Sequence, residues 1–266
     1  MPGAVLRCAV TAVEAWAQDQ LVARERRGHV EALRDRELLR WVGRARFVTA
    51  EVLAQRFGVS VRRANSRVSL LTAAGLLQCQ RECGGQRRAV FLSGAGAEAL
   101  GLPRRRAPRP ELQRAHELAI AHLVTAIELD RPGAAVYAER ECRTLERDGS
   151  MRYSVDLFEP GRGRSRRWPD VVVEIEGVRS AIEIEIAPKT TERIERIVTG
   201  YVVSDAFGAV RFLVASAALA RRLAVVCRKT GGGAFAGTRL LLAPWPGADD
   251  AEIARIEAVL RGVRGG

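Results

Sequence analysis

One stretch decides the fold of the N-terminal half: Val48 to Leu77, which reads VTAEVLAQRFGVSVRRANSRVSLLTAAGLL. Thr49 is of a residue type that caps helices, and Gly58 favours the left-handed turn that ends them, so a short helix is predicted between the two. Ser60 is then predicted to cap a longer helix. The inward positions of that helix, at helical spacing, are predicted to be Val61, Ala64, Val68 and Leu71. Two helices joined by a glycine turn indicate a helix-turn-helix.

The residues on either side extend this pattern to a winged helix-turn-helix. Upstream, Asp35 is predicted to cap a supporting helix. The apolar face of that helix consists of Leu38, Leu39 and Val42. Downstream, strand-like runs at 77–82 and 87–92 flank a pair of glycines, which predicts a two-stranded hairpin, the wing. The N-terminal half is therefore expected to consist of three helices and a hairpin.

The outward face of the helix that follows Ser60 is polar and basic. It carries Arg62, Arg63, Ser66 and Arg67, with Asn65 at its edge, while Arg87 and Arg88 lie near the tip of the hairpin. Such side chains donate hydrogen bonds to phosphates and base edges when a helix enters the major groove of DNA. These residues predict double-stranded DNA as the partner. The alternative is that the helix only packs and its arginines are solvated.

The composition agrees with a polyanionic partner but is weak evidence by itself. The chain has 266 residues, enough for two domains, and a formal net charge of +12. Lys189 and Lys229 are the only lysines among its 43 basic residues, a skew that GC-rich codon usage also produces. No apolar run reaches about 18 residues, so no membrane contact is expected. The five cysteines are scattered and form no CxxC pair, which favours a reducing, cytoplasmic setting.

The sequence divides into four parts. We expect a helical extension over residues 1–30, the DNA-binding domain over 31–100, a proline- and arginine-rich linker over 101–110, and an α/β domain over 111–266. The α/β domain is predicted to have helices at 111–129 and 190–204 and strands at 134–138, 171–175, 181–186, 210–215 and 239–243. Its residues 161–167 are predicted to form a basic loop. The N-terminal extension is the candidate element for homodimer formation, since winged-helix proteins often pair on two-fold sites.

Three carboxylates are predicted to gather on two neighbouring strands. Asp170 begins one strand, and Glu183 and Glu185, two residues apart on the next, point to the same side. Such a group could hold a divalent cation. Without a cation the carboxylates repel one another, so at least one should have a raised pKa. The alternative is that Asp170 caps a turn and the glutamates form a solvated strand face beside local arginines.

This pattern resembles the PD-(D/E)XK nuclease-like fold. The resemblance implies that Asp170 and Glu183 bind Mg²⁺ or Mn²⁺, which activates a water and stabilises the leaving phosphate oxygen. Glu185 stands where that family has a lysine, so Lys189, four residues later, is the candidate for the missing amine. Glu117, on the first helix of this domain, is a candidate additional metal ligand. The expected fold is thus a two-domain α/β protein, with an N-terminal winged helix-turn-helix and a C-terminal PD-(D/E)XK nuclease-like domain.

The whole arrangement is similar to the replication-relaxation family of plasmids and integrative elements. The similarity lies in the helix-turn-helix region, in HELAIAHL at 116–123 and in WPDVVVEI…AIEIEIAPKTTERI…GY at 168–201. It implies a DNA-binding factor in the replication, relaxation or conjugative transfer of a mobile element. Plasmid replication or transfer proteins would be its partners, and the second domain would nick DNA with a metal.

Two other functions fit the same residues. One is a non-enzymatic transcriptional regulator whose second domain dimerises or binds a ligand. Such a regulator has no need of the three carboxylates. The other is a restriction-like nuclease, which would be expected to show the conventional lysine.

Overall fold

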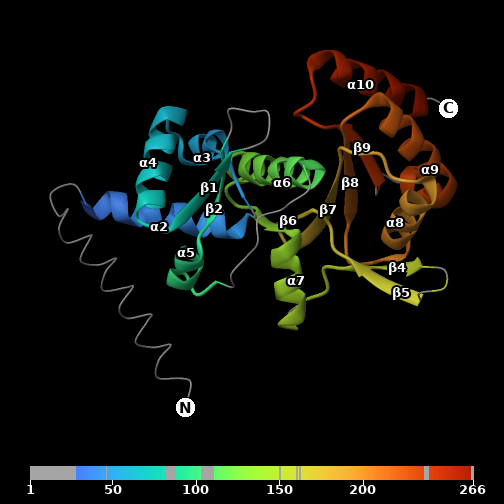
Figure 1. Cartoon of the computed structure of the whole chain (residues 1–266). Coiled ribbons are helices and arrows are strands. Elements are labelled where there is room, and N and C mark those ends of the chain that lie inside the picture. Colours follow the sequence, from blue (N-terminus) through green and yellow to red (C-terminus); the bar gives the residue numbers. More distant parts are fainter. Residues whose placement is uncertain are drawn as a thin grey trace. The chain divides into compact units, whose positions relative to one another are not determined.

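The structure is a computed structural model that describes residues 28–45, 47–81, 88–102, 111–149, 151–159, 161, 163–236 and 240–264. The N-terminal extension up to residue 27, Arg87 and residues 103–110 of the expected linker lie outside these ranges. The chain has a mixed α/β fold (Figure 1). It splits into two compact units, one ending at Ala121 and the other beginning at His122. No helix in the described ranges is long and apolar enough to cross a membrane.

The first unit joins helices to a two-stranded antiparallel hairpin. Its elements are α2 (Gly28–Arg44), α3 (Ala50–Phe57), α4 (Val61–Ala73), β1 (Leu77–Arg81), β2 (Arg88–Leu92) and α5 (Gly94–Ala99). Val48, just before α3, exchanges two backbone hydrogen bonds of 2.9 and 2.8 Å with Val90 of β2. This bridge ties the hairpin to the helices. The short helix, the longer helix and the hairpin strands expected from the sequence are confirmed.

Local sequence explains where α3 and α4 begin and end. Gly58 ends α3 with a φ of 60°, a left-handed conformation that glycine adopts without strain. The Ser60 hydroxyl accepts a hydrogen bond of 3.2 Å from the backbone N–H of Arg63, as expected of an N-cap. Thr49 precedes α3 but makes no capping hydrogen bond through its side chain. The end of α3 and the start of α4 are therefore explained by the residue types at Gly58 and Ser60.

Two expectations about the helices are wrong. Val61 is 41% exposed, because it is the first residue of α4 and extends beyond the helices that cover Ala64, Val68 and Leu71. Asp35 does not cap a helix, because α2 already begins at Gly28. Asp35 therefore lies inside α2, seven residues after its first residue, where no N-cap is needed.

The second unit is built on a five-stranded sheet in the order β3-β6-β7-β8-β9. The first three strands in that order are antiparallel, and β7, β8 and β9 are parallel. Helix α6 (Glu111–Asp130), inside which the division between the units falls, leads into it. The elements that follow are β3 (Ala135–Ala138), α7 (Glu139–Arg147), β4 (Val155–Glu159), β5 (Gly163–Arg167), β6 (Val171–Ile175), β7 (Val178–Glu185), α8 (Thr191–Val203), β8 (Ala209–Val214), α9 (Ala217–Ala236), β9 (Leu240–Pro244) and α10 (Asp250–Arg264).

The central strand of this sheet, β7, forms a hairpin with β6. Glu176 and Gly177 join them, both with positive φ (51° and 77°), as a tight two-residue hairpin requires. Val171 pairs with Ile182, so Asp170 enters the sheet beside the second half of β7. Residues 181–185 are buried, and β7 has a neighbouring strand on each edge. Glu183 and Glu185 are thus part of the interior, and the alternative that they form a solvated strand face is wrong.

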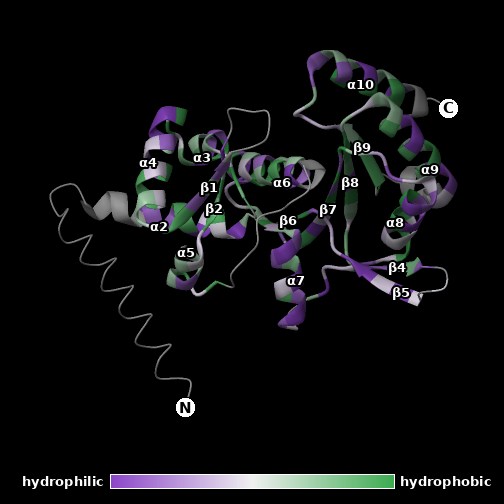
Figure 2. Cartoon of the chain, in the orientation of Figure 1, coloured by the Kyte–Doolittle hydropathy of each residue, from purple (hydrophilic) through white to green (hydrophobic). Residues whose placement is uncertain are grey.

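A separate ribbon of two antiparallel strands, β4 and β5, lies beside α8 (Figure 1). The expected basic loop at 161–167 is wrong, because its residues 163–167 form β5. Figure 2 shows why apolar spacing did not reveal this strand: β5 is hydrophilic, whereas β9 is hydrophobic along its length. Helix α8 approaches β4 closely at Gly200, where a Cβ would lie 2.8 Å from Leu157 Cδ2.

Candidate nucleic-acid interface and carboxylate cluster

Helix α4 presents a polar face to solvent in the first unit. The side chains of Arg62, Arg63, Asn65 and Ser66 are exposed, as expected from the sequence. The Ser66 hydroxyl donates a hydrogen bond of 3.0 Å to the backbone carbonyl of Arg62, one turn earlier. Its lone pairs remain on the exposed face. Among the described residues, no ion pair neutralises Arg62 or Arg63, so both guanidinium groups stay available to a phosphate or a base edge.

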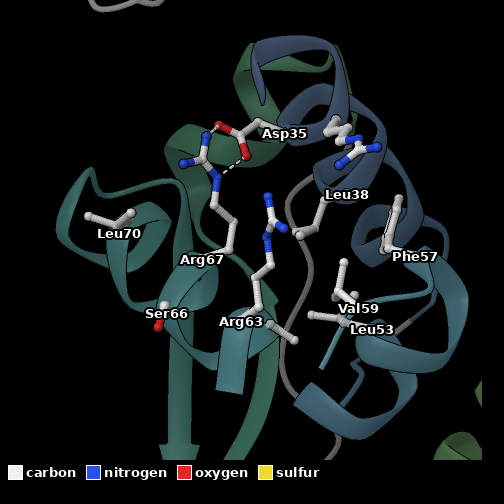
Figure 3. Close-up of a pocket in the computed structure, with 11 residues that line it drawn as sticks. Asp35, Leu38, Leu53, Phe57, Val59, Arg63, Ser66, Arg67 and Leu70 are labelled. Carbon is white, nitrogen blue, oxygen red and sulfur yellow. Dashed lines mark hydrogen bonds and ion pairs between the residues drawn. The ribbon is translucent and has the colours of Figure 1, made fainter. Parts of the chain in front are cut away.

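Arg67 behaves differently from the other arginines of α4. Its guanidinium donates two hydrogen bonds to the Asp35 carboxylate on α2, one to each oxygen (Figure 3). The two side chains are 22% and 21% exposed. The expectation that Arg67 belongs to the open outward face is therefore wrong, because Arg67 faces α2. The ion pair links α4 to its supporting helix, α2. Asp35 thus serves as the partner of Arg67.

A cavity of about 230 Å³ lies between α2, α3 and α4. Its lining is mostly apolar and includes Leu38, Leu53 and Phe57. Arg63 and Arg67 extend from α4 over this cavity toward α2 (Figure 3). Arg62 and Asn65 do not line it. The residues predicted on one face of α4 thus fall into two groups, because Arg63, Ser66 and Arg67 line the cavity whereas Arg62 and Asn65 do not.

The hairpin adds one described residue to the candidate interface. Arg88, the first residue of β2, is exposed and lies opposite Arg81 in the register of β1 and β2. Arg87 lies outside the described residues. The exposed guanidinium groups of α4 and β2 are consistent with contacts to a polyanion, and they carry the basic charge expected of such a surface.

In the second unit, Glu183 is fully buried and neutralised by its neighbours. Arg167, at the end of β5, donates hydrogen bonds of 3.2 and 2.5 Å to its two carboxylate oxygens, and the Tyr201 hydroxyl of α8 also donates to it. Glu183 in turn raises the pKa of the Arg167 guanidinium above its usual value. Burial, reinforced by Glu183, raises the pKa of Tyr201 well above its usual value. Arg167 and Tyr201 are functional neighbours that the sequence did not reveal.

The other two carboxylates also have defined partners. Asp170 accepts a hydrogen bond of 2.8 Å from the backbone N–H of Ile184, and Glu185 accepts one of 2.5 Å from the Lys189 amine. Burial raises the pKa of Glu185 above its usual value, although the Lys189 charge opposes this shift. The expected raised pKa is confirmed at Glu185, with burial as its main cause. The Lys189 amine thus reaches the carboxylate of Glu185, and its role as the missing amine stays a prediction.

A fourth carboxylate, Glu146 of α7, organises the start of β4 and the end of β5. It accepts hydrogen bonds from the backbone N–H of Tyr153 (2.9 Å), the Ser154 hydroxyl (2.6 Å) and Trp168 Nε1 (3.0 Å). Burial favours its protonated form, but these donors outweigh that effect and lower the pKa of Glu146. The sequence carried no local signal for this role, because all the donors come from residues after α7.

The arrangement of Asp170, Glu183 and Glu185 does not fit a divalent metal ion. Mg²⁺ and Mn²⁺ favour several oxygen ligands around the ion. Both oxygens of Glu183 already accept hydrogen bonds from Arg167, and Glu185 holds the cation of Lys189. No group of three or more His, Cys, Asp or Glu side chains in the described ranges could hold a metal ion. Glu117 lies in the first unit, on the N-terminal half of α6, and joins no such group.

Glu185→Gln should remove the part of the pH dependence of stability that comes from this carboxyl group. A carboxyl group whose pKa is raised in the folded state stabilises the fold only below its unfolded pKa, and that contribution is lost as pH rises through the folded pKa. The variant lacks this titration, so its free energy of unfolding relative to the wild type should increase as pH rises from about 4 to 8. Urea unfolding across that range measures the difference.

Glu146→Gln is the matched control, and its effect on stability should depend on pH in the opposite direction. The pKa of Glu146 is lowered in the folded state, so its contribution is present above the unfolded pKa and is lost as pH falls. The deficit of this variant should therefore be largest near neutral pH. Parallel pH profiles for the two variants would contradict the opposite environments of Glu185 and Glu146.

No protein-family model, no curated protein and no solved structure matches this chain. The similarity to the replication-relaxation family remains a prediction from short motifs. The function must therefore be argued from the two sites themselves.

Proposed function

We propose that this chain binds double-stranded DNA through a winged helix-turn-helix, with α4 as the recognition helix and β1–β2 as the wing. The observation that carries the proposal is the exposed N-terminal half of α4, where the Ser60 cap is followed by Arg62, Arg63, Asn65 and Ser66. In helix-turn-helix proteins, the N-terminal residues of the second helix contact base edges. Arg62 and Arg63 supply donors for guanine and phosphate, and Asn65 supplies an amide for adenine.

The test is the affinity of the full chain for duplex DNA as a function of salt. Each neutralised phosphate releases counterions, so the logarithm of the binding constant falls with the logarithm of the salt concentration by about 0.9 per phosphate contact. We expect a steep negative slope between about 50 and 200 mM salt. The wild-type chain failing to bind any duplex at the low end of that range would refute the proposal.

Within this proposal, the second unit is a PD-(D/E)XK nuclease-like domain that does not cleave DNA. Its mixed sheet supports the likeness, as does the Asp170–Glu183 pair, with Asp170 directly before β6 and Glu183 on β7. The cations of Arg167 and Lys189 beside the carboxylates support the absence of cleavage. We expect supercoiled plasmid to remain intact with Mg²⁺ or Mn²⁺. Wild-type nicking that is lost in Asp170→Ala would instead show that the carboxylates rearrange around a metal.

The biological role that we propose is replication, relaxation or conjugative transfer of a mobile element, and it rests on the family resemblance. A homodimer on a two-fold site and plasmid replication or transfer proteins are the partners that this role implies. The second candidate is a non-enzymatic transcriptional regulator. The closed arrangement of Glu183 and Glu185 favours it, since a regulator needs no metal.

A further inference from the structure

The β4–β5 ribbon has one polar, basic face that carries an exposed aromatic ring. Phe158 of β4 is 68% exposed and lies opposite Arg164 of β5, while Asp156 lies opposite Arg166. Side chains alternate along a strand, so these four residues share one face of the ribbon. An aromatic side chain that leaves two-thirds of its surface in water loses the benefit of burial, and a binding partner would restore it.

The charge of this face is positive. Arg164 and Arg166 are exposed, and Arg152 pairs with the Asp156 carboxylate at 2.8 Å, which neutralises the acidic residue of the face. Arg166 also lies 3.4 Å from Glu146, a long contact that leaves its side chain 64% exposed. Phe158 lies opposite Arg164 and diagonal to Arg166, with Asp156 two residues before it on β4, and it is the only apolar side chain among these four residues. A protein interface of ordinary size has an apolar core, which these four described residues do not provide.

The base of the ribbon is held firmly on both strands. Glu146 fixes the backbone before β4, and Arg167 at the end of β5 is bound to the buried Glu183. On the opposite face, α8 lies against β4 at Gly200, where a Cβ would come within 2.9 Å of the Asp156 carbonyl oxygen. A rigid base gives the exposed face a fixed geometry, which lowers the entropy cost of binding.

We propose that this face of the β4–β5 ribbon binds unpaired DNA bases, with Phe158 stacking on one base and Arg164 and Arg166 contacting the neighbouring phosphates. Aromatic rings combined with a basic surface are the usual means of holding single-stranded nucleic acid. The inference rests on the proposed function in that it takes DNA as the partner of the chain. The surface, however, is distinct from α4, and the two bind different forms of DNA.

The test compares binding of the full chain to a labelled oligodeoxythymidine and to a labelled blunt duplex. Phe158→Ala should weaken binding to the single strand roughly 5- to 150-fold, the usual effect of removing one stacking ring, and should leave duplex binding unchanged. Phe158→Tyr should retain single-strand binding, because it keeps the ring. Val203→Ala, which shortens a side chain that is 73% exposed on α8, is the matched control and should have no effect.

Three outcomes would overturn this proposal. They are a wild-type chain that does not bind the oligodeoxythymidine, a Phe158→Ala variant with unchanged single-strand affinity, and a variant that changes only self-association in sedimentation. The last would assign Phe158 to a contact between copies of the chain. Loss of duplex binding in Arg62→Glu with single-strand binding intact would separate the two surfaces. Failure of duplex binding in the wild type would affect only the proposed function of α4.

Discussion

Replacing Arg167 with methionine is expected to lower the free energy of unfolding of the second unit by about 3–5 kcal/mol. Glu183 is fully buried, and within the part of the chain that the structure describes, the Tyr201 hydroxyl would be the only donor left to its carboxylate in the variant. Methionine preserves most of the volume of the arginine stem but leaves a buried charge without its cation. Urea unfolding at neutral pH measures the loss.

The double variant Arg167→Met/Glu183→Gln tests whether the uncompensated charge is the cause. Because it removes both charges, it should be more stable than Arg167→Met, although it contains one more substitution. Lys229→Met is the control for loss of an ion pair at the surface, since the Lys229 side chain is 71% exposed in its pair with Glu195. That change should have little effect. A loss in Arg167→Met no larger than in Lys229→Met would contradict the structural role given to Arg167.

The elements that the sequence predicted well are those with a local cause. Ser60 and Gly58 mark the ends of α4 and α3 because capping and positive φ depend on single residue types. The strands expected at 171–175 and 181–186, which correspond to β6 and β7, were predicted because both carry β-branched residues. In each case the information lies within a few residues of the feature.

The β4–β5 ribbon could not be predicted in this way. Its second strand, Gly163–Arg167, has no apolar residue, and its pairing with Val155–Glu159 supplies the backbone hydrogen bonds that make it a strand. Apolar alternation detects strands that bury one face in a core. The β4–β5 ribbon is polar and is held in place by individual contacts, such as the one between Arg167 and Glu183, so it gives no such signal.

The surroundings of the three carboxylates could not be predicted from local sequence patterns either. Three acidic residues with family-like spacing predicted a metal site, and two of the expectations, a raised pKa and a nearby Lys189 amine, are confirmed at Glu185. The cation beside Glu183 comes from β5, where the sequence predicts a loop, and the hydroxyl comes from Tyr201 on α8. Neutralisation of a buried charge depends on tertiary contacts, which spacing along one chain does not encode.

Reversing the charges of Arg62 and Arg63 together should weaken duplex binding roughly 30-fold or more at moderate salt, since each arginine that contacts a base edge contributes about 1–3 kcal/mol. The slope of the salt dependence should also fall by about 1.8, if each guanidinium neutralises one phosphate. Arg67 is left unchanged, because its reversal would set two carboxylates against each other at Asp35 and disturb the fold of the first unit.

Arg221→Glu/Arg228→Glu is the matched control. Both residues are exposed on α9, in the second unit, and the double exchange changes the net charge of the chain by the same amount. If binding depended only on the overall charge of +12, both double variants would lose affinity equally. A recognition helix predicts a large loss for the α4 variant and a small one for the α9 variant. Equal losses would remove α4 as the DNA-reading element, because the attraction would then belong to the whole surface rather than to one helix.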